Sequence, residues 1–380
     1  DQFNIAGGWG SGTFVGSVGV TLNNLSIKNF FKKGAWRPYP MGQNQRLSIS
    51  AQTNGTYYKA FAISFTDPWM GGRKPNSFTI SAHYSDENNA YYAWQKGTRY
   101  FRTAGVAAGL GKRLDWPDPY FTFYAEASYE RYMLKDWNTF VLKNGAANLL
   151  SIRLVLGRNS VDQPIYPRRG SDFSVSVQLT PPYSLWDGKD YKSTALSEQE
   201  RYNWIEFHKW MLKGQWFTPL TRNGNLVLMA RAEMGYLGHY NKNKVSPFER
   251  FEVGGDGMTG YNMYGIDIIS MRGYDDGALD PVGSNYSWAY NKYPMELRYP
   301  LLLKGQTNIY VLGFLEGGNG FTSWKEFSPF KIKRSAGIGV RLFLPVVGMV
   351  GVDWGWGFDP AAGQTKRSGS HIHFTMGMQF

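Results

Sequence analysis

Three short stretches of the sequence hold residue types that could carry out chemistry. Residues Gly255–Gly260 match the spacing G-x-G-x-x-G, but no segment with a helical period follows them, so we expect no nucleotide site. His371 and His373 share one face of a predicted strand and could hold a metal, yet no cysteine or carboxylate ligand lies close by in the sequence. Neither G-x-S-x-G nor H-E-x-x-H occurs. The sequence therefore predicts no enzyme, no cofactor and no metal, and a hydrolase assembled from scattered loop residues is the least favoured alternative.

The third stretch, Met271, Arg272, Gly273 and Tyr274, lies in a segment of unusual length. From about residue 237 to residue 292 the alternation of polar and apolar residues stops, and no helical period replaces it. A loop that long within a compact domain is uncommon and usually functional. The guanidinium of an arginine presents a rigid fork of donors that matches carboxylates. We expect the loop to fold inward and to place Arg272 against carboxylates; the alternative is a solvated surface arginine.

The composition is typical of a membrane barrel rather than of a soluble β-sandwich. The chain has 45 glycines, no cysteine and 63 aromatic residues (25 Tyr, 24 Phe and 14 Trp), yet its mean hydropathy is negative, at −0.40. An outer-membrane barrel needs two girdles of aromatic residues and a polar lumen, which accounts for this mixture. No apolar run approaches the ~18 residues that a transmembrane helix needs, so a helical membrane protein is excluded.

The net charge of +12 does not indicate nucleic acid as a partner. The basic residues form small groups in the connections between predicted strands, such as Lys32-Lys33, Lys112-Arg113 and Lys366-Arg367, and make no single stripe. We interpret most of them as solvated loop ends. Attraction to the phosphates of lipid or lipopolysaccharide is a secondary role that we predict for them.

Alternation of polar and apolar residues repeats along most of the chain. Phe78 and Ile80 alternate with Ser77 and Thr79, which is the period of a strand with one face in lipid and the other in water. About sixteen such segments occur, one of them at 202–212, each close to the ~9–11 residues that a tilted spanning strand needs. We predict an all-β fold, a transmembrane antiparallel β-barrel of about sixteen strands. Residues 1–380 form a single domain in this prediction, and the long loop at approximately 237–292 is folded inward.

The same period predicts which side chains face lipid and which face the lumen. Short turns at one end of the barrel should lie in the periplasm, and longer loops at the other end should lie at the cell surface. The residues expected to contact lipid include Phe78, Ile80, Phe121, Phe123, Val350, Val352 and Trp354, and those expected in a hydrated lumen include Glu126, Glu130, Arg153, Asp172 and Gln178.

The first and last strands should meet in a weak lateral seam. The first strand contains Gly7, Gly8 and Gly10, which lack the side chains that lock cross-strand pairs. Apolar residues alternate up to the final Phe380, as in the assembly signal of an outer-membrane barrel. The alternative is an ordinary closed seam whose glycines accommodate curvature. The residues predicted to form the seam are Gln2, Phe3, Asn4, Ile5, Ala6, Gly7, Gly8, Phe374, Thr375, Met376, Gly377, Met378, Gln379 and Phe380.

Arg272-Gly273-Tyr274, together with the segments Thr66–Trp69 and Asp162–Gly170 and the aromatic C-terminus, carries a resemblance to a known family. Over essentially its whole length the sequence resembles the barrel portion of the BamA family, the central subunits of the outer-membrane protein assembly machinery. In that family an R-G-[FY] motif of the sixth surface loop folds into the barrel. The resemblance implies that Arg272 pairs with lumenal Glu296 and Glu316. The family's periplasmic POTRA domains have no counterpart in this sequence, so we expect substrate delivery to lie outside it.

The resemblance also implies a function and a set of partners. We expect an outer-membrane protein that folds and inserts unfolded β-barrel clients through the seam, with accessory assembly lipoproteins as further partners. A client would add strands to an exposed backbone edge. The alternatives are a TamA-like protein, a two-partner secretion pore and a passive diffusion channel, because all of them would share most of the barrel features.

Overall fold

The computed structural model describes residues 2–10, 13–36, 39–53, 57–72, 75–90, 97–257, 265–284, 286–304, 307–344 and 348–376. Sixteen of the strands in these residues form one antiparallel sheet in chain order, β1 to β11 followed by β14 to β18, which confirms the predicted all-β fold. Their bounds are β1 Gln2–Gly10, β2 Thr13–Leu25, β3 Gln45–Thr53, β4 Tyr58–Asp67, β5 Asn76–Asn88, β6 Tyr100–Arg113, β7 Phe121–Lys135, β8 Gly145–Asn159, β9 Gly170–Leu179, β10 His208–Pro219, β11 Val227–Gly238, β14 Ala289–Lys304, β15 Thr307–Phe321, β16 Lys333–Leu344, β17 Gly348–Pro360 and β18 Arg367–Met376.

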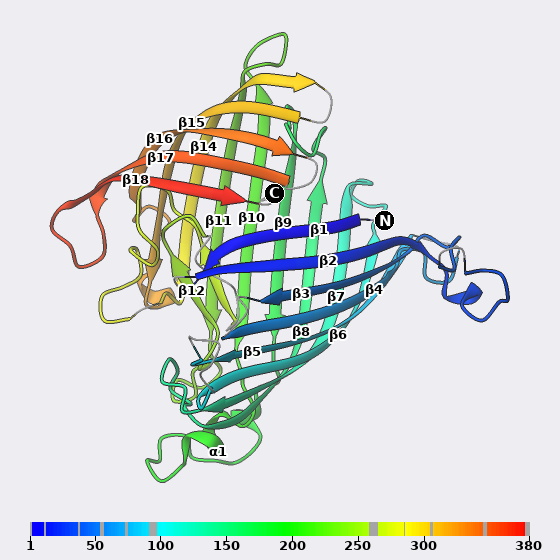
Figure 1. Cartoon of the computed structure of the whole chain (residues 1–380). Coiled ribbons are helices and arrows are strands. Elements are labelled where there is room, and N and C mark those ends of the chain that lie inside the picture. Colours follow the sequence, from blue (N-terminus) through cyan, green and yellow to red (C-terminus); the bar gives the residue numbers. More distant parts are fainter. Residues whose placement is uncertain are drawn as a thin grey trace.

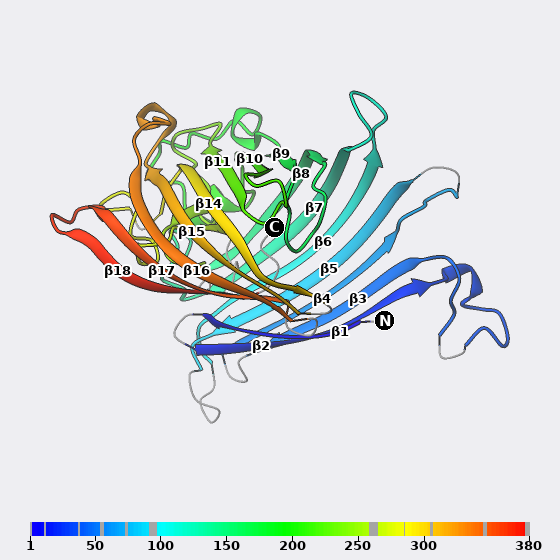
Figure 2. The same cartoon turned by 90° about the horizontal axis from the view of Figure 1, so that it is seen from above.

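The sheet curls until its two ends approach each other. In Figures 1 and 2, β1 and β18 lie facing each other on one side of the molecule, while β6 to β11 form the opposite wall. Neighbouring strands of an even-numbered up-and-down sheet alternate in direction, so β1 and β18 run antiparallel. The sheet therefore has the geometry of a barrel whose first and last strands approach each other at one lateral position, without pairing between their described residues.

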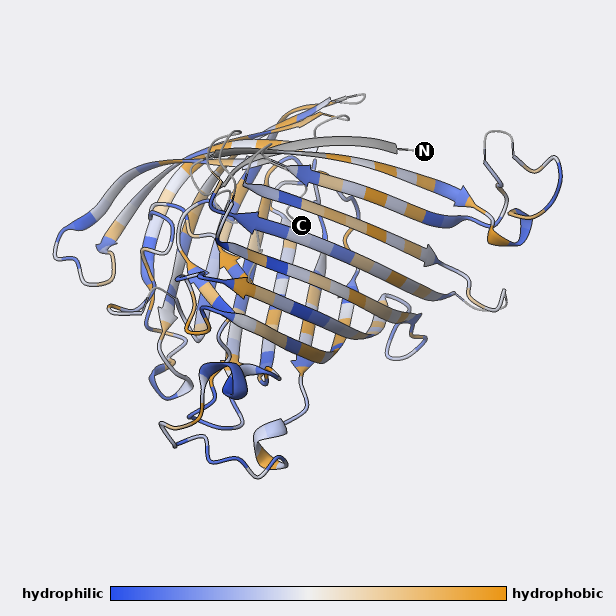
Figure 3. Cartoon of the chain, turned by 60° about the horizontal axis from the view of Figure 1, so that its bottom comes forward, coloured by the Kyte–Doolittle hydropathy of each residue, from blue (hydrophilic) through white to orange (hydrophobic). Residues whose placement is uncertain are grey.

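Hydrophobic and hydrophilic residues alternate along the strands of the sheet (Figure 3). None of the seven residues predicted to contact lipid is buried, and Ile80, Val352 and Trp354 are each more than 40% exposed. On the inner face, Glu126, Glu130, Arg153 and Gln178 line a cavity of about 510 Å³. This separation is what a bilayer outside and water inside require.

Two predictions about local structure were wrong. The strand expected at 202–212 is preceded by a short helix, α1 (Glu198–Tyr202), and the strand itself is β10. The helix begins there because Ser197 and Glu200 form a reciprocal capping box. The long loop is also not without strands, since β12 (Arg250–Val253) pairs in parallel with β13 (Ile266–Ile269).

The connections follow the predicted asymmetry with one exception. Long connections, residues 180–207 and 239–288, join strands at one end of the sheet, and most connections at the other end are short. The exception at the short-turn end is the segment between β2 and β3, which contains the 3₁₀ helix η1 (Ile27–Asn29). The remaining 3₁₀ helices are η2 (Tyr183–Leu185) and η3 (Trp324–Glu326). Of the helices in the described ranges, none is long and apolar enough to cross a membrane.

Adjacent positions on β5 test which face lies in lipid. Ile80 points outward and Ser81 lines the lumenal cavity. We expect Ile80→Lys to destabilise the folded barrel by up to about 2–4 kcal/mol, because the ammonium would enter hydrocarbon. Ser81→Lys is the matched control and should change stability little, because the lumen keeps the ammonium hydrated. The measurement is urea unfolding in lipid vesicles, and equal effects of the two substitutions would contradict the assignment of faces.

Candidate functional site

The long loop between β11 and β14 is folded against the inner wall of the sheet. Its backbone is held by β12, which pairs with β13 on one side and exchanges two hydrogen bonds between Phe251 and Ser287 on the other (2.7 and 3.0 Å). Gly254 and Gly255 follow β12 with positive φ angles, and a Cβ on Gly255 would lie 1.6 Å from the carboxylate of Asp276. The glycine-rich start of the loop is therefore needed for the close approach of its own chain segments.

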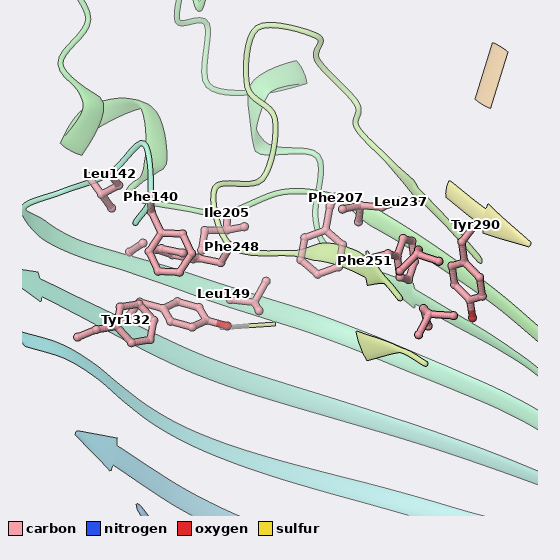
Figure 4. Packing of buried hydrophobic residues seen from close by; sticks show 14 of the residues in the cluster. Tyr132, Phe140, Leu142, Leu149, Ile205, Phe207, Leu237, Phe248, Phe251 and Tyr290 are labelled. Carbon is pink, nitrogen blue, oxygen red and sulfur yellow. The ribbon is translucent and has the colours of Figure 1, made fainter. Parts of the chain in front are cut away.

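An aromatic cluster attaches the first part of the loop to the wall. Phe248 from the loop packs among Phe101, Tyr132 and Phe140, with ring centroids 5.8, 4.5 and 4.9 Å away (Figure 4). Phe101 lies on β6 and Tyr132 on β7. Phe248 is 1% exposed, so one of the buried apolar clusters lies between the loop and the inner wall.

A buried cation provides a second attachment that the sequence analysis missed. Lys209 on β10 forms ion pairs with two loop carboxylates, Glu249 and Asp267. Lys209 and Glu249 are both buried, so each charge is compensated by its partner and not by water. Lys209 falls on the inward face of β10 and also within the strand predicted at 202–212, but the sequence analysis did not assign the two faces of that strand.

Arg272 at the tip of the loop lies against the opposite part of the wall. Its Nε and its backbone N–H both donate to Glu316 Oε2, at 3.0 and 3.1 Å, and its Nη2 lies 2.8 Å from Glu296 Oε1. Nη1 lies 3.5 Å from Asp353 Oδ2, and the guanidinium stacks over the ring of Phe314 at 3.8 Å. The structure thus brings together the three residues singled out in the sequence and adds Asp353.

Each carboxylate around Arg272 also has a cation of its own from the wall. Arg298 lies 2.7 Å from Glu296, Arg341 binds both oxygens of Asp353 at 2.7 Å, and Lys292 lies 3.5 Å from Glu316. Without Arg272 the group would still contain three carboxylates and three cations. The loop arginine is therefore a fourth cation added to a wall that is neutral without it.

Burial alone would disfavour the charge on Arg272, which is 8% exposed. Burial lowers its pKa, but Glu316, Glu296 and Asp353 outweigh that effect and hold the pKa of the guanidinium above its ordinary value. The guanidinium therefore keeps its charge in this buried position. Its position depends on charge pairing and on the planar shape of the guanidinium together.

The two residues that follow Arg272 fix the loop tip to the last strands. The N–H of Gly273 donates to Nε2 of His373 on β18 (2.8 Å), and the hydroxyl of Tyr274 donates to the carbonyl of Arg334 (2.8 Å). Met271 and Tyr274 are fully buried. The close approach depends on inward-facing glycines of β17, since a Cβ on Gly355 or Gly357 would lie within 3 Å of Gly273.

The histidine pair is therefore part of the attachment of the loop. His371 lies 3.1 Å from Asp275 of the loop, and His373 binds Gly273. No group of three or more His, Cys, Asp or Glu side chains suited to a metal occurs in the part of the chain that the structure describes. Gly255 and Asp256 of the G-x-G-x-x-G stretch belong to the loop and follow β12, whereas residues 258–260 lie outside the described ranges.

The seam residues are only partly described. Gln2 to Gly8 belong to β1, which pairs with β2, and Phe374 to Met376 belong to β18, which pairs with β17. Gly377 to Phe380 lie outside the described residues. No ladder joins residues 2–10 to residues 367–376, and the N–H of Phe374 donates instead to the carboxylate of Asp256 in the loop (3.2 Å).

The fold and the inward loop together define an outer-membrane β-barrel with an occupied lumen. A family model described as the Omp85 superfamily domain matches residues 41–380, and the chain belongs to this superfamily. It is accordingly an outer-membrane β-barrel protein.

The sequence identity to an individual relative is low. The chain is 23% identical over 329 residues to the outer membrane protein assembly factor BamA of Neisseria meningitidis serogroup B, a match that covers 79% of this chain and 34% of that protein. This chain thus spans about a third of the length of that relative.

Solved structures share the fold at lower identity. BamA from Haemophilus ducreyi lacking POTRA domains 1–3 has a TM-score of 0.66 at 17% identity, covering 98% of this chain and 68% of that one. CdiB from Escherichia coli has a TM-score of 0.57 at 13% identity, covering 98% and 61%. CdiB from Acinetobacter baumannii has a TM-score of 0.54 at 11% identity, covering 98% and 58%.

Substitution of Arg272 should free the loop more than it unfolds the wall. Arg272→Ala removes a cation from a buried group, a change that ordinarily costs about 3–5 kcal/mol. We expect a loss at or below the lower end of that range, because the wall cations still neutralise the carboxylates. The loop should become sensitive to protease in folded barrels, and Arg272→Lys should restore protection only in part, because an ammonium lacks the fork of donors. Unchanged protection in Arg272→Ala would contradict this attachment.

Alanine substitutions at two glycines of the same loop distinguish the effect of steric contact from the effect of backbone strain. Gly273 and Gly283 have φ angles of +86° and +80°, but a Cβ on Gly273 would lie 2.8 Å from Cβ of Ser335, whereas nothing lies within 4 Å of one on Gly283. Gly283→Ala should cost only the roughly 1–2 kcal/mol of a left-handed backbone. Gly273→Ala should in addition displace the loop tip and increase the rate of amide hydrogen exchange in the loop tip. Similar exchange in both variants would show that the tip does not need this close approach.

Proposed function

We propose that this chain is the barrel of an assembly factor that folds and inserts other β-barrel proteins into the outer membrane. The observation that supports the proposal most directly is that the sheet has two ends, β1 and β18, with no pairing between their described residues. Unpaired backbone groups are costly in lipid, so such an edge favours the addition of another strand. An unfolded client barrel, with its own alternating strands, is the partner of matching chemistry.

In the proposed function the loop occupies part of the unpaired edge of β18 and part of the lumen. The Asp256 carboxylate accepts the Phe374 N–H of the last strand, and the buried group around Arg272 holds the loop nearby. In the proposed cycle a client strand would replace Asp256 at that amide. No covalent bond changes in this process, so the proposal includes neither an enzymatic activity nor a cofactor.

The proposal extends to partners. Unfolded barrel clients would be the substrates, accessory assembly lipoproteins would bind outside the membrane, and lipid and lipopolysaccharide would contact the outer face. The similarity to the meningococcal assembly factor supports this choice over other members of the superfamily, although it covers a third of that protein.

A translocation pore, TamA-like or of the two-partner secretion kind, is the second candidate. It is supported by the lumenal cavity of about 510 Å³, whose lining includes His83, Glu126 and Arg153. The aromatic cluster and the loop fill other parts of the lumen. Ion conductance by the purified barrel in planar bilayers would favour the pore or a passive channel, whereas failed assembly of other barrels after depletion would favour the assembly factor.

Covalent closure of the seam tests the proposed mechanism. The chain has no cysteine, so Asn4→Cys on β1 can be combined with single cysteines scanned over residues 372–376 until oxidation links the strands. We expect the linked protein to lose client insertion and the reduced protein to regain it.

The matched control is a cysteine pair at Ser64 and Ser81, which face each other in the β4–β5 ladder. Linking this pair should leave insertion unchanged, because that ladder does not open. Full insertion by a barrel with a linked seam would refute lateral opening.

A further inference from the structure

The described residues of the connection between β2 and β3, 26–36 and 39–44, form a projection with an apolar and basic surface. Its base is fixed by buried Ser26, whose hydroxyl donates to Gln43 (3.0 Å), and by the Ile27 N–H, which donates to Gln45 (2.8 Å). Asn29 donates to the carbonyl of Met41 across the connection (3.1 Å). In Figures 1 and 2 the segment extends beyond the ends of β2 and β3, away from the rest of the barrel.

Three aromatic side chains form the outer part of this projection. Phe30 makes edge contacts with Phe31 and Trp36, with ring centroids 5.4 and 5.0 Å apart, and the indole N–H of Trp36 donates to the carbonyl of Phe30 (3.0 Å). Phe31 is nevertheless 92% exposed and Trp36 is 53% exposed. Large aromatic rings exposed together on a loop mark a site of contact with another apolar surface.

The charge of the projection is of one sign. Lys28, Lys32 and Lys33 are exposed, and none of them has an ion-pair partner among the residues that the structure describes. The sequence contains no Asp or Glu from residue 2 to residue 66. The projection therefore complements an anionic surface.

The projection is continuous with the face that contacts lipid. Val18 and Val20 of β2 and Ile49 of β3 are exposed on the outer face of the strands that lead into it. The connection lies at the short-turn end of the barrel, where Trp69 and Trp116 are also exposed. Aromatic residues concentrate at the level of lipid headgroups in outer-membrane barrels.

We propose that residues 26–36 and 39–41 form a membrane anchor that inserts Phe31 and Trp36 into the leaflet at the short-turn end and binds anionic phospholipid headgroups through Lys28, Lys32 and Lys33. Aromatic rings at the headgroup level and lysines near anionic phosphates act together in interfacial binding. The anchor lies at the end of the sheet where β1 begins. It would hold the bilayer against the first strands of the barrel, independently of whether the seam opens.

A spin label at Ala35 tests the proposal in the whole chain. Ala35 is half-buried in the projection, and Ala35→Cys gives a single attachment point in a chain that has no cysteine. The labelled barrel is placed in nanodiscs of phosphatidylcholine alone or mixed with phosphatidylglycerol. Relaxation by oxygen, which concentrates in lipid, is compared with relaxation by a water-soluble nickel chelate. Lys189→Cys, exposed in the long connection between β9 and β10, is the control for a label in water.

We expect oxygen to relax the Ala35 label severalfold more than the nickel chelate does, and the preference to increase when phosphatidylglycerol is present. The double variant Phe31→Ser and Trp36→Ser should shift the label towards the nickel chelate. The triple variant Lys28→Gln, Lys32→Gln and Lys33→Gln should abolish the difference between the two lipid compositions. A label that favours nickel in both lipids, that is shielded from both reagents as beneath a protein partner, or that ignores phosphatidylglycerol would overturn the anchor.

Discussion

The ion group around Arg272 is the interaction on which the interior of this barrel depends. A sixteen-stranded sheet encloses a lumen too wide for its own side chains to fill, and here the loop between β11 and β14 supplies much of the missing core. Its attachments differ in kind: Phe248 packs in an aromatic cluster, Lys209 pairs with loop carboxylates, and Arg272 joins Glu316, Glu296 and Asp353. Of these, the arginine joins the loop to the strands that end the sheet.

The arrangement of charges allows the loop to be held without making the wall depend on it. Lys292, Arg298 and Arg341 already neutralise the three carboxylates, so departure of Arg272 leaves no unpaired carboxylate behind. Most buried ion pairs lack this property, and removing one partner leaves an expensive buried charge. A loop bound in this way can be firmly placed in one state and displaced in another at a moderate cost in free energy.

Period-two alternation was sufficient to predict the sheet and the direction of most of its side chains. Glu296 and Glu316 were expected in the lumen because of the family resemblance. Alternation itself places Asp353 there, because Val352 and Trp354 on either side face lipid. It could not show which inward carboxylates meet Arg272, since that depends on the path of a loop without a local period. The approach of Gly273 to Gly355 and Gly357 is equally non-local. The shifted start of β10 has a local cause, the Ser197–Glu200 capping box, which competes with alternation and was overlooked.

The central claim is that Arg272 and the wall carboxylates act as one coupled group that holds the loop in the barrel. A double-mutant cycle with Arg272→Gln and Glu316→Gln, measured by urea unfolding and by hydrogen exchange of the loop, tests it most directly. We predict a coupling free energy of about 0.5–3 kcal/mol, the range for residues that share one network, with the double variant losing little more than Arg272→Gln alone. Additive losses, with loop exchange unchanged in either single variant, would contradict the account.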